Sequence, residues 1–279
     1  MILRGCTLSR KNHAHEIAKT MSTIPTSPPM TPAVTEAQYA WQTCLRVESA
    51  PATPYQQHFN PKLLDVLTHA PRVLLDVGCS SGNLGAYVKK LHPTCRTIGI
   101  EPNRATANIA AHNLDQVLCG KFEDLNLETE GITHGSTDTV ILADVLEHMY
   151  DPWAAMVKLK PYLSTDAQII LSIPNTRHLW LMQNLLDKGM WTYAEKGLLD
   201  ISHISFFTFR EIVDFLMQTG YRMEFVNRFL DEGLVAFHEQ NRSNAETNIR
   251  FGRMVLEKVT PQELTELCTW QFFIRARVA

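Results

Sequence analysis

Short runs of β-branched and apolar residues alternate with longer amphipathic segments along the chain after Pro61. This alternation predicts strand–helix units, which are typical of a parallel sheet with helices on both faces. The predicted strands are Arg72–Gly78, Arg96–Pro102, Gln116–Phe122, Thr137–Val145, Ala167–Asn175, Arg222–Arg228 and Thr269–Val278. The predicted helices are Leu84–Leu91, Arg104–Asn113, Pro152–Leu163 and Phe209–Thr219. The pattern therefore predicts a doubly wound α/β fold, in which the polar segment 232–266 bridges to the last strand.

The beginning of the chain lacks this alternation. Pro, Thr, Ser and Ala dominate Thr23–Pro54, which is the composition of a linker. Basic residues outnumber acids before Met21, which suits an organelle transit peptide, although a flexible arm or a start at Met21 is the simpler interpretation. We predict a flexible arm and linker over residues 1–54 and one globular domain over residues 55–279.

Composition and charge narrow the class of protein. The 279 residues are 45% hydrophobic, which is enough for one sizeable core. The 26 basic and 29 acidic residues nearly balance, so the charge does not favour nucleic acid as a partner. The six cysteines include no C-x-x-C pair, and no apolar run approaches the roughly 20 residues of a membrane span. We expect a cytoplasmic protein without a membrane span.

Acidic residues stand at or just beyond the ends of four successive predicted strands. They are Asp76, Glu101, Glu123 and Asp144. Because the carboxyl ends of parallel strands meet at one edge, where a doubly wound sheet binds its ligand, these side chains are expected to gather there. Solvated loop carboxylates explain any one of them, but their common position favours a ligand site.

The segment "VLLDVGCSSGNLG", Val73–Gly85, predicts a strand that opens into a glycine-bearing turn. A dinucleotide loop would carry glycine at positions 78, 80 and 83, and only Gly78 satisfies this pattern. Small residues at Gly78, Ser80 and Gly82 instead let the backbone approach a ligand that ends in an amino acid. Glu101 follows Gly82 by 19 residues, where an acid can accept both ribose hydroxyls. The loop favours a nucleoside with an unphosphorylated ribose.

These motifs resemble the class I S-adenosylmethionine-dependent methyltransferases over roughly Tyr55 to Val278. "LLDVGCSSGNLG", "GIEPN", "CGKFEDL" and "DTVILADVLEHMYDPW" are similar to the family's first motif, ribose segment, adenine-side loop and fourth-strand motif. Downstream, "SIPNTRH", "GMWTYAEKGLLDISHISFFT" and "FLMQTGY" resemble a subgroup associated with glycan and cell-surface polysaccharide biosynthesis. The resemblance implies a seven-stranded, Rossmann-like sheet with a lid insertion after the fifth strand, at about residues 176–208.

The resemblance also implies S-adenosyl-L-methionine as the cofactor. Gly78 and Gly82 would contact its methionine part, and Asp76 would order the turn or meet the ammonium through water. Glu101 would hold the ribose. The implied cofactor-binding residues are Asp76, Gly78, Ser80, Gly82, Asn83, Glu101, Pro102, Phe122, Glu123, Asp144 and Val145.

The later residues of that set would contact the adenine and sulfonium ends of the cofactor. Phe122 would flank the adenine and Glu123 would reach its edge, while Asp144 and Val145 would lie beside the sulfonium. Ser80 replaces a glycine that is common in the family. Lys121 stands where the family often has an aspartate that accepts from the adenine amino group, and a lysine cannot accept.

Methyl transfer to a hydroxyl requires that a base take the proton, and histidine is suited to this at neutral pH. The candidates are His148, His178 and His203. His203 is favoured because the resemblance places "DISHISFF" in the lid above the sheet edge, although a buried histidine with only a structural role fits any one of them.

Asp144, Glu147 and His148 have i, i+3 and i+4 spacing and would share one face of a helix. With His203 they could bind a divalent metal. Glu147 and His148 could instead anchor the start of the helix beside the cofactor, and we prefer this interpretation, so no metal site is predicted.

The sequence as a whole indicates a methyltransferase that acts on an oxygen of a small molecule or glycan precursor. Two alternatives stay open. One is a protein that binds the cofactor without catalysis as a partner of a biosynthetic assembly, and the other is a metal-dependent hydroxyl methyltransferase.

Overall fold

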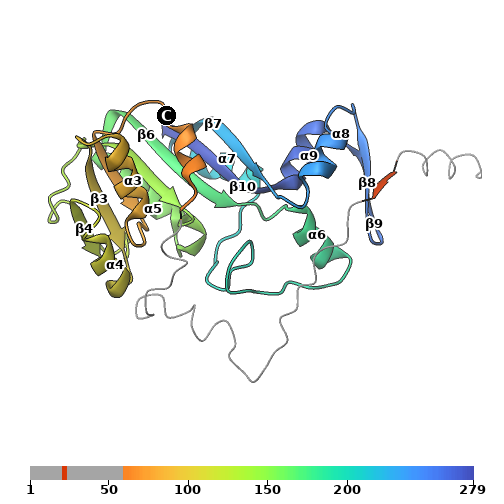
Figure 1. Cartoon of the computed structure of the whole chain (residues 1–279), viewed down its shortest axis with the longest axis horizontal. Helices are drawn as coiled ribbons and strands as arrows, with labels where there is room; N and C mark the ends of the chain where they lie inside the picture. Colours follow the sequence, from red (N-terminus) through yellow and green to blue (C-terminus); the bar gives the residue numbers. More distant parts are fainter. Residues whose placement is uncertain (1–20, 24–58) are drawn as a thin grey trace, which may run out of the picture. The chain divides into compact units, whose positions relative to one another are not determined.

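The computed structural model describes residues 21–23 and 59–279 (Figure 1). These residues divide into two compact units. The larger unit contains residues 59–177, 192–229 and 269–279, and the smaller one contains residues 21–23, 178–191 and 230–268. Most of the arm and linker predicted over residues 1–54 lies outside the described residues.

A seven-stranded sheet forms the centre of the larger unit, with the order β4-β3-β2-β5-β6-β10-β7. Its strands are β2 (Val73–Val77), β3 (Arg96–Glu101), β4 (Gln116–Cys119), β5 (Thr137–Ala143), β6 (Leu163–Pro174), β7 (Tyr221–Leu230) and β10 (Thr269–Val278). In this order, neighbouring strands from β4 through β3, β2 and β5 to β6 pair in parallel, whereas β10 pairs antiparallel with β6. The prediction of a seven-stranded, doubly wound α/β sheet is confirmed, with an antiparallel last strand.

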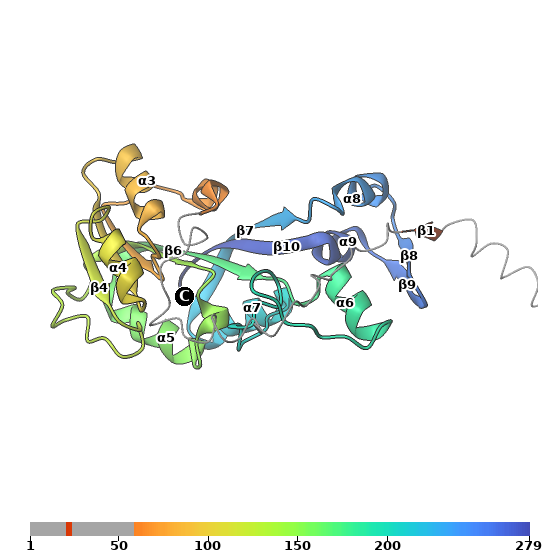
Figure 2. The ribbon, with the colours of Figure 1, turned by 60° about the horizontal axis from the view of Figure 1, so that its bottom comes forward.

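Apolar clusters cover both faces of this sheet. Leu74 belongs to one cluster and Leu75 to the other, because successive side chains of a strand point to opposite faces. Leu84 of helix α3 (Asn83–Leu91) packs into the first cluster and Met156 of helix α5 (Pro152–Leu159) into the second, and Figure 2 shows these helices on opposite sides of the sheet. Burial on both faces explains why β2, apart from Asp76, and the second half of β5, residues 140–143, are apolar.

Side chains cap most of the α-helices of the larger unit, whereas the helix that starts after Gly82 has no side-chain cap. The helices of this unit are α3 (Asn83–Leu91), α4 (Arg104–Ala110), α5 (Pro152–Leu159) and α7 (Phe209–Gln218), with short 3₁₀ helices η2 (Pro61–Val66), η3 (Leu146–His148) and η4 (Lys160–Tyr162). The Asn103 side chain accepts from the Thr106 amide at 2.9 Å and so caps α4. Thr208 and Glu211 form a capping box at α7. The cap at Asn103 fixes the turn that follows β3.

The smaller unit has a core of its own. It contains α6 (Leu179–Leu186), α8 (Val235–Asn241), α9 (Pro261–Cys268) and a sheet of β1 (Met21–Thr23), β8 (Thr247–Phe251) and β9 (Met254–Val259). Leu179, Leu234, Phe237 and Ile249 are buried together there. Segment 232–266 therefore does more than bridge to the last strand, because it builds most of this core.

The lid predicted at residues 176–208 divides between the two units. Residues 178–191 with α6 belong to the smaller unit and residues 192–208 to the larger one. The lid therefore stays a prediction. Within the described residues, no helix combines the length and apolar character needed to cross a membrane.

Candidate active site

The loop after β2 requires glycine at two positions. Gly78 has φ +73°, and a Cβ there would lie 2.5 Å from Cγ2 of Val145. Gly82 has φ +77°, and a Cβ would lie 3.0 Å from Cγ of Leu114. The amides of Gly78 and Cys79 donate to the Ile100 carbonyl at 2.8 and 3.0 Å, which ties the loop to β3. At Gly78 the loop therefore presents only its backbone, and the missing side chain leaves room for Val145.

Ser80 occupies the left-handed region, with φ 51°. A side chain in this region costs about 1 kcal/mol, whereas a glycine raises the entropy of the unfolded chain and so destabilises the fold by about as much. Ser80→Gly should therefore leave the free energy of unfolding within about 1 kcal/mol of wild type. Chemical denaturation measures this, with Gly82→Ala as the variant expected to be clearly destabilised. A large loss in Ser80→Gly would contradict our explanation.

Glu101 joins the two loops at this edge. Its Oε2 accepts from the Ser80 amide at 3.0 Å and its Oε1 from the Asn103 amide at 2.9 Å. The residue is only 6% exposed, and burial raises its pKa while the two amides oppose the shift. Each carboxylate oxygen keeps lone pairs for a further donor. Pro102, half-buried, and Asn103 continue this turn.

Asp76 is a buried carboxyl beside Glu101. It lies in β2 opposite Gly99 and Ile141, is 2% exposed, and its Oδ2 has no hydrogen-bond partner among the residues that the structure describes. Burial, and secondarily the charge of Glu101, raises its pKa to about 7. A buried carboxyl without a donor suits a cationic ligand.

Asp76→Asn should change how stability depends on pH. Because the folded-state pKa of Asp76 lies above its ordinary 3.8, the folded protein keeps a proton that the unfolded chain loses between about pH 4 and 7. Asp76 therefore lowers stability progressively as pH rises through that window, and the amide removes this loss. We expect a higher Tm than wild type above pH 7, measured by thermal unfolding from pH 4.5 to 8. A lower Tm at pH 8 would refute the assignment.

Lys158 of α5 holds the loop after β4. Its Nζ donates to the carbonyls of Phe122, Glu123 and Leu125 at 2.6, 2.8 and 2.6 Å, and lies 5.1 Å from the centre of the Phe122 ring. The Phe122 ring is 3% exposed and belongs to the core, whereas Glu123 and Lys121 are exposed. Lys158 was not predicted from the sequence, because no local motif marks it.

Asp144 stands at the end of β5 in the left-handed region, with φ 55°. Its amide donates to Oγ of Ser172 at 3.0 Å, and the Ser172 hydroxyl donates to its carboxylate at 2.9 Å. The Gln271 side-chain amide also donates to Asp144. Because β10 runs antiparallel, Gln271 pairs with Pro174 and reaches the carboxyl edge of the neighbouring strands. Gln271 was not predicted as a site residue because the sequence pattern does not give the direction of β10.

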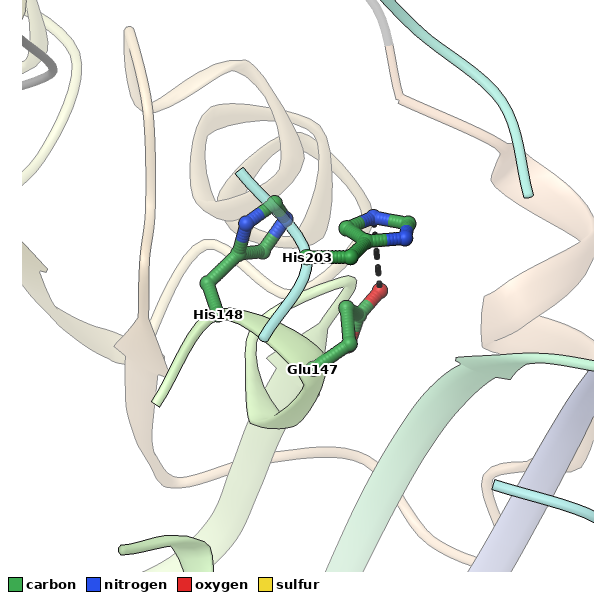
Figure 3. A group of neighbouring side chains, drawn as sticks. All are labelled: Glu147, His148 and His203. Carbon is green, nitrogen blue, oxygen red and sulfur yellow. Dashed lines mark ion pairs between the residues drawn. The ribbon is translucent and has the colours of Figure 1, made fainter. Parts of the chain in front are cut away.

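Glu147, His148 and His203 form a cluster in the larger unit (Figure 3). Glu147 and His148 come from η3 directly after β5, and one ligand atom from each residue lies within 4.8 Å of the other two. The helical face expected to contain Asp144, Glu147 and His148 is only partly formed, because Asp144 lies before η3 and accepts a hydrogen bond from Ser172 instead. The His148 and His203 ring centres are 4.7 Å apart.

His203 presents an unprotonated nitrogen to this cluster. Its Nδ1 lies 3.2 Å from the Leu198 carbonyl, which assigns the ring hydrogen to Nδ1 and leaves Nε2 4.0 Å from Oε1 of Glu147. Burial, together with His148, lowers the pKa of His203 to about 4. Desolvation also lowers the pKa of His148, although this residue is exposed. His203 is therefore neutral at pH 7, able to accept a proton or to bind a metal.

His178, the third predicted histidine, belongs to the smaller unit. It stands at the N-cap of α6, is fully buried, and its Nε2 lies 3.5 Å from Oδ2 of Asp231. Burial lowers its pKa to about 3. The structure thus places His178 with Asp231, outside the residues that form the cluster at the sheet edge.

Comparison with known sequences identifies the domain. A family model described as a methyltransferase domain matches residues 54–225. An uncharacterized 37.1 kDa protein in transposon TN4556 of Streptomyces fradiae is 26% identical over 125 residues, which are 44% of this chain and 36% of that protein. The (S)-tetrahydroprotoberberine N-methyltransferase of Eschscholzia californica is 23% identical over 123 residues, 43% of this chain and 35% of the enzyme. The chain thus spans about a third of the length of these curated relatives.

Solved structures share the fold. A SAM-dependent methyltransferase of Thermotoga maritima, described as a possible histamine N-methyltransferase, has a TM-score of 0.52 and 17% identity, covering 78% of this chain and 87% of that one. A SAM-dependent methyltransferase of Archaeoglobus fulgidus has a TM-score of 0.50 and 14% identity, covering 74% and 85%. Because the family match covers more than half of the sequence, the chain belongs to the methyltransferase-domain family and carries an S-adenosylmethionine-dependent methyltransferase domain.

Proposed function

We propose that the protein transfers the methyl group of S-adenosylmethionine to a hydroxyl oxygen of a small molecule or of a sugar in a glycan precursor. The observation that carries this proposal is the cluster of Glu147, His148 and His203, which lies directly after β5 and contains a neutral imidazole. The downstream segments that resemble a glycan-associated subgroup support a sugar as the acceptor.

The cofactor would lie along the carboxyl edge of the sheet. Glu101 would accept from the ribose hydroxyls, since both of its oxygens already face the turns of Ser80 and Asn103. Oδ2 of Asp76, which has no hydrogen-bond partner within residues 21–23 and 59–279, would meet the methionine ammonium, directly or through water. The backbone that Lys158 holds after β4 would border the adenine.

The sulfonium end would then lie beside Asp144 and Val145, since Val145 packs against Gly78 and precedes Glu147 by two residues. In this arrangement the acceptor oxygen forms a bond to the methyl carbon while the carbon–sulfur bond breaks and its electron pair stays on sulfur. Much of the rate acceleration comes from holding oxygen, carbon and sulfur in line. The hydroxyl proton must leave the oxygen during or after attack.

Methyl transfer from labelled S-adenosylmethionine to panels of phenols, sugars, nucleotide sugars and amines tests the proposal. We expect label in a hydroxyl-bearing compound, with one S-adenosylhomocysteine formed for each methyl transferred. Label in amines alone would overturn the choice of oxygen. Cofactor binding without label in any acceptor would favour a non-catalytic partner in a biosynthetic assembly.

A further inference from the structure

We propose that Glu147, His148 and His203 bind a divalent transition-metal ion, and that the acceptor hydroxyl coordinates to this ion. The first part stands on the structure alone, whereas the second rests on the proposed function. One ligand atom from each side chain lies within 4.8 Å of the others, and Oε1 of Glu147 is 4.0 Å from Nε2 of His203. Metal–ligand bonds of about 2.0–2.2 Å place two ligands of one ion roughly 3–4.4 Å apart, so a small contraction closes the site.

Glu147 supplies the strongest reason for an ion. The residue is 1% exposed, and neither carboxylate oxygen has a hydrogen-bond partner among the described residues. Leaving such a group buried without a partner is costly, whether it is charged or neutral. The nearest ring nitrogen, Nε2 of His203, carries no hydrogen to donate, because the ring hydrogen is directed to Leu198. A cation between these groups satisfies both the oxygens and the nitrogen.

The rings of His148 and His203 are each held in place by contacts of the nitrogen Nδ1. Nδ1 of His203 faces the Leu198 carbonyl, and Nδ1 of His148 lies 3.2 Å from the Ser202 carbonyl and 3.1 Å from its hydroxyl. The Ser202 hydroxyl in turn donates to Asp200 at 2.6 Å. Figure 3 shows the opposite ring nitrogen of His148 turned toward His203. Metal-binding histidines are typically fixed in this way through the nitrogen that does not bind the ion.

The ligand set indicates the class of ion. Two imidazole nitrogens and one carboxylate suit zinc, manganese, iron or cobalt, whereas magnesium and calcium favour oxygen ligands. Three protein ligands leave at least one position open for an oxygen from outside. A hydroxyl bound there would have a lower pKa, so that its proton would pass to water; the alkoxide would then bond to the methyl carbon as the carbon–sulfur bond breaks and its electron pair stays on sulfur. His203 is then a ligand of the ion, and no separate base is needed.

Metal binding can be measured without the methyl-transfer reaction. Protein stripped with a chelator is titrated with Co²⁺, followed by visible absorption, and with Mn²⁺, followed by electron paramagnetic resonance. We expect one ion per chain in wild type and at least about tenfold weaker binding in Glu147→Gln and His203→Ala, since the first loses the charge of the carboxylate ligand and the second loses an imidazole ligand. His112→Ala, an exposed histidine of the larger unit, is the control and should bind like wild type.

Two results would overturn the site: no stoichiometric binding of either ion to wild type, or equal binding by Glu147→Gln with an unchanged Tm. Calorimetry with S-adenosylhomocysteine shows whether each variant is still folded around its cofactor site. If an ion binds but no hydroxyl is methylated, the metal site stands and the proposed function fails. If a hydroxyl is methylated equally well after chelation, the metal fails and the proposed function stands.

Discussion

The Glu101→Ala variant is expected to bind S-adenosylmethionine at least about 100-fold more weakly than wild type. The substitution removes a buried carboxylate that accepts from the Ser80 and Asn103 amides and would accept from the ribose. A hydrogen bond to a charged group contributes about 1.5–3 kcal/mol, and each 1.4 kcal/mol is a factor of ten in affinity. The loss of the ribose contacts alone therefore accounts for about two orders of magnitude.

Isothermal calorimetry with S-adenosylhomocysteine measures this loss. Glu130→Ala removes an exposed carboxylate of the same unit and serves as the control, with affinity unchanged. Because the Ser80 and Asn103 amides also lose their acceptor, the Tm of Glu101→Ala is recorded in parallel. An affinity within a few-fold of wild type in the folded variant would contradict the role of Glu101.

The His203→Ala variant is expected to keep its cofactor affinity while methyl transfer slows by about 10²–10⁴-fold. His203 lies in the cluster with Glu147 and His148, and Leu198 fixes its ring. Nε2 of His203 can act either as a proton acceptor or as a metal ligand. Either role concerns the molecule that receives the methyl group and does not involve cofactor binding.

Turnover of the best hydroxyl acceptor, with binding of S-adenosylhomocysteine measured on the same preparation, tests this separation. His112→Ala is again the control with wild-type turnover. Wild-type turnover by His203→Ala would refute a direct role for this histidine, and loss of cofactor binding would mean that the substitution disturbs the cofactor site instead.

Much of the sheet could be predicted because its strands are buried on both faces and so appear as apolar runs. The ends of these runs lie close enough to the true strand ends that the sequence pattern alone places Asp76, Glu101 and Asp144 at one edge. Gln271 could not be placed there, because the direction of a last strand depends on pairing with β6 and leaves no local signal.

The spacing of residues along the sequence was also insufficient to predict the cluster of Glu147, His148 and His203. A helical face of Asp144, Glu147 and His148 assumes one helix, but the chain turns through the left-handed region at Asp144 before η3 begins. Packing between segments that are distant in the sequence then brings His203 to Glu147. Such long-range contacts, like those of Lys158 with the loop after β4, follow from no motif.

Calorimetric titration of the protein with S-adenosylhomocysteine tests the central claim most directly, because the proposed cofactor site consists of Gly78, Glu101 and their neighbours in one unit. We expect saturable binding of one molecule per chain, with a dissociation constant in roughly the micromolar range. The absence of binding by both S-adenosylhomocysteine and S-adenosylmethionine at millimolar concentration would contradict the account.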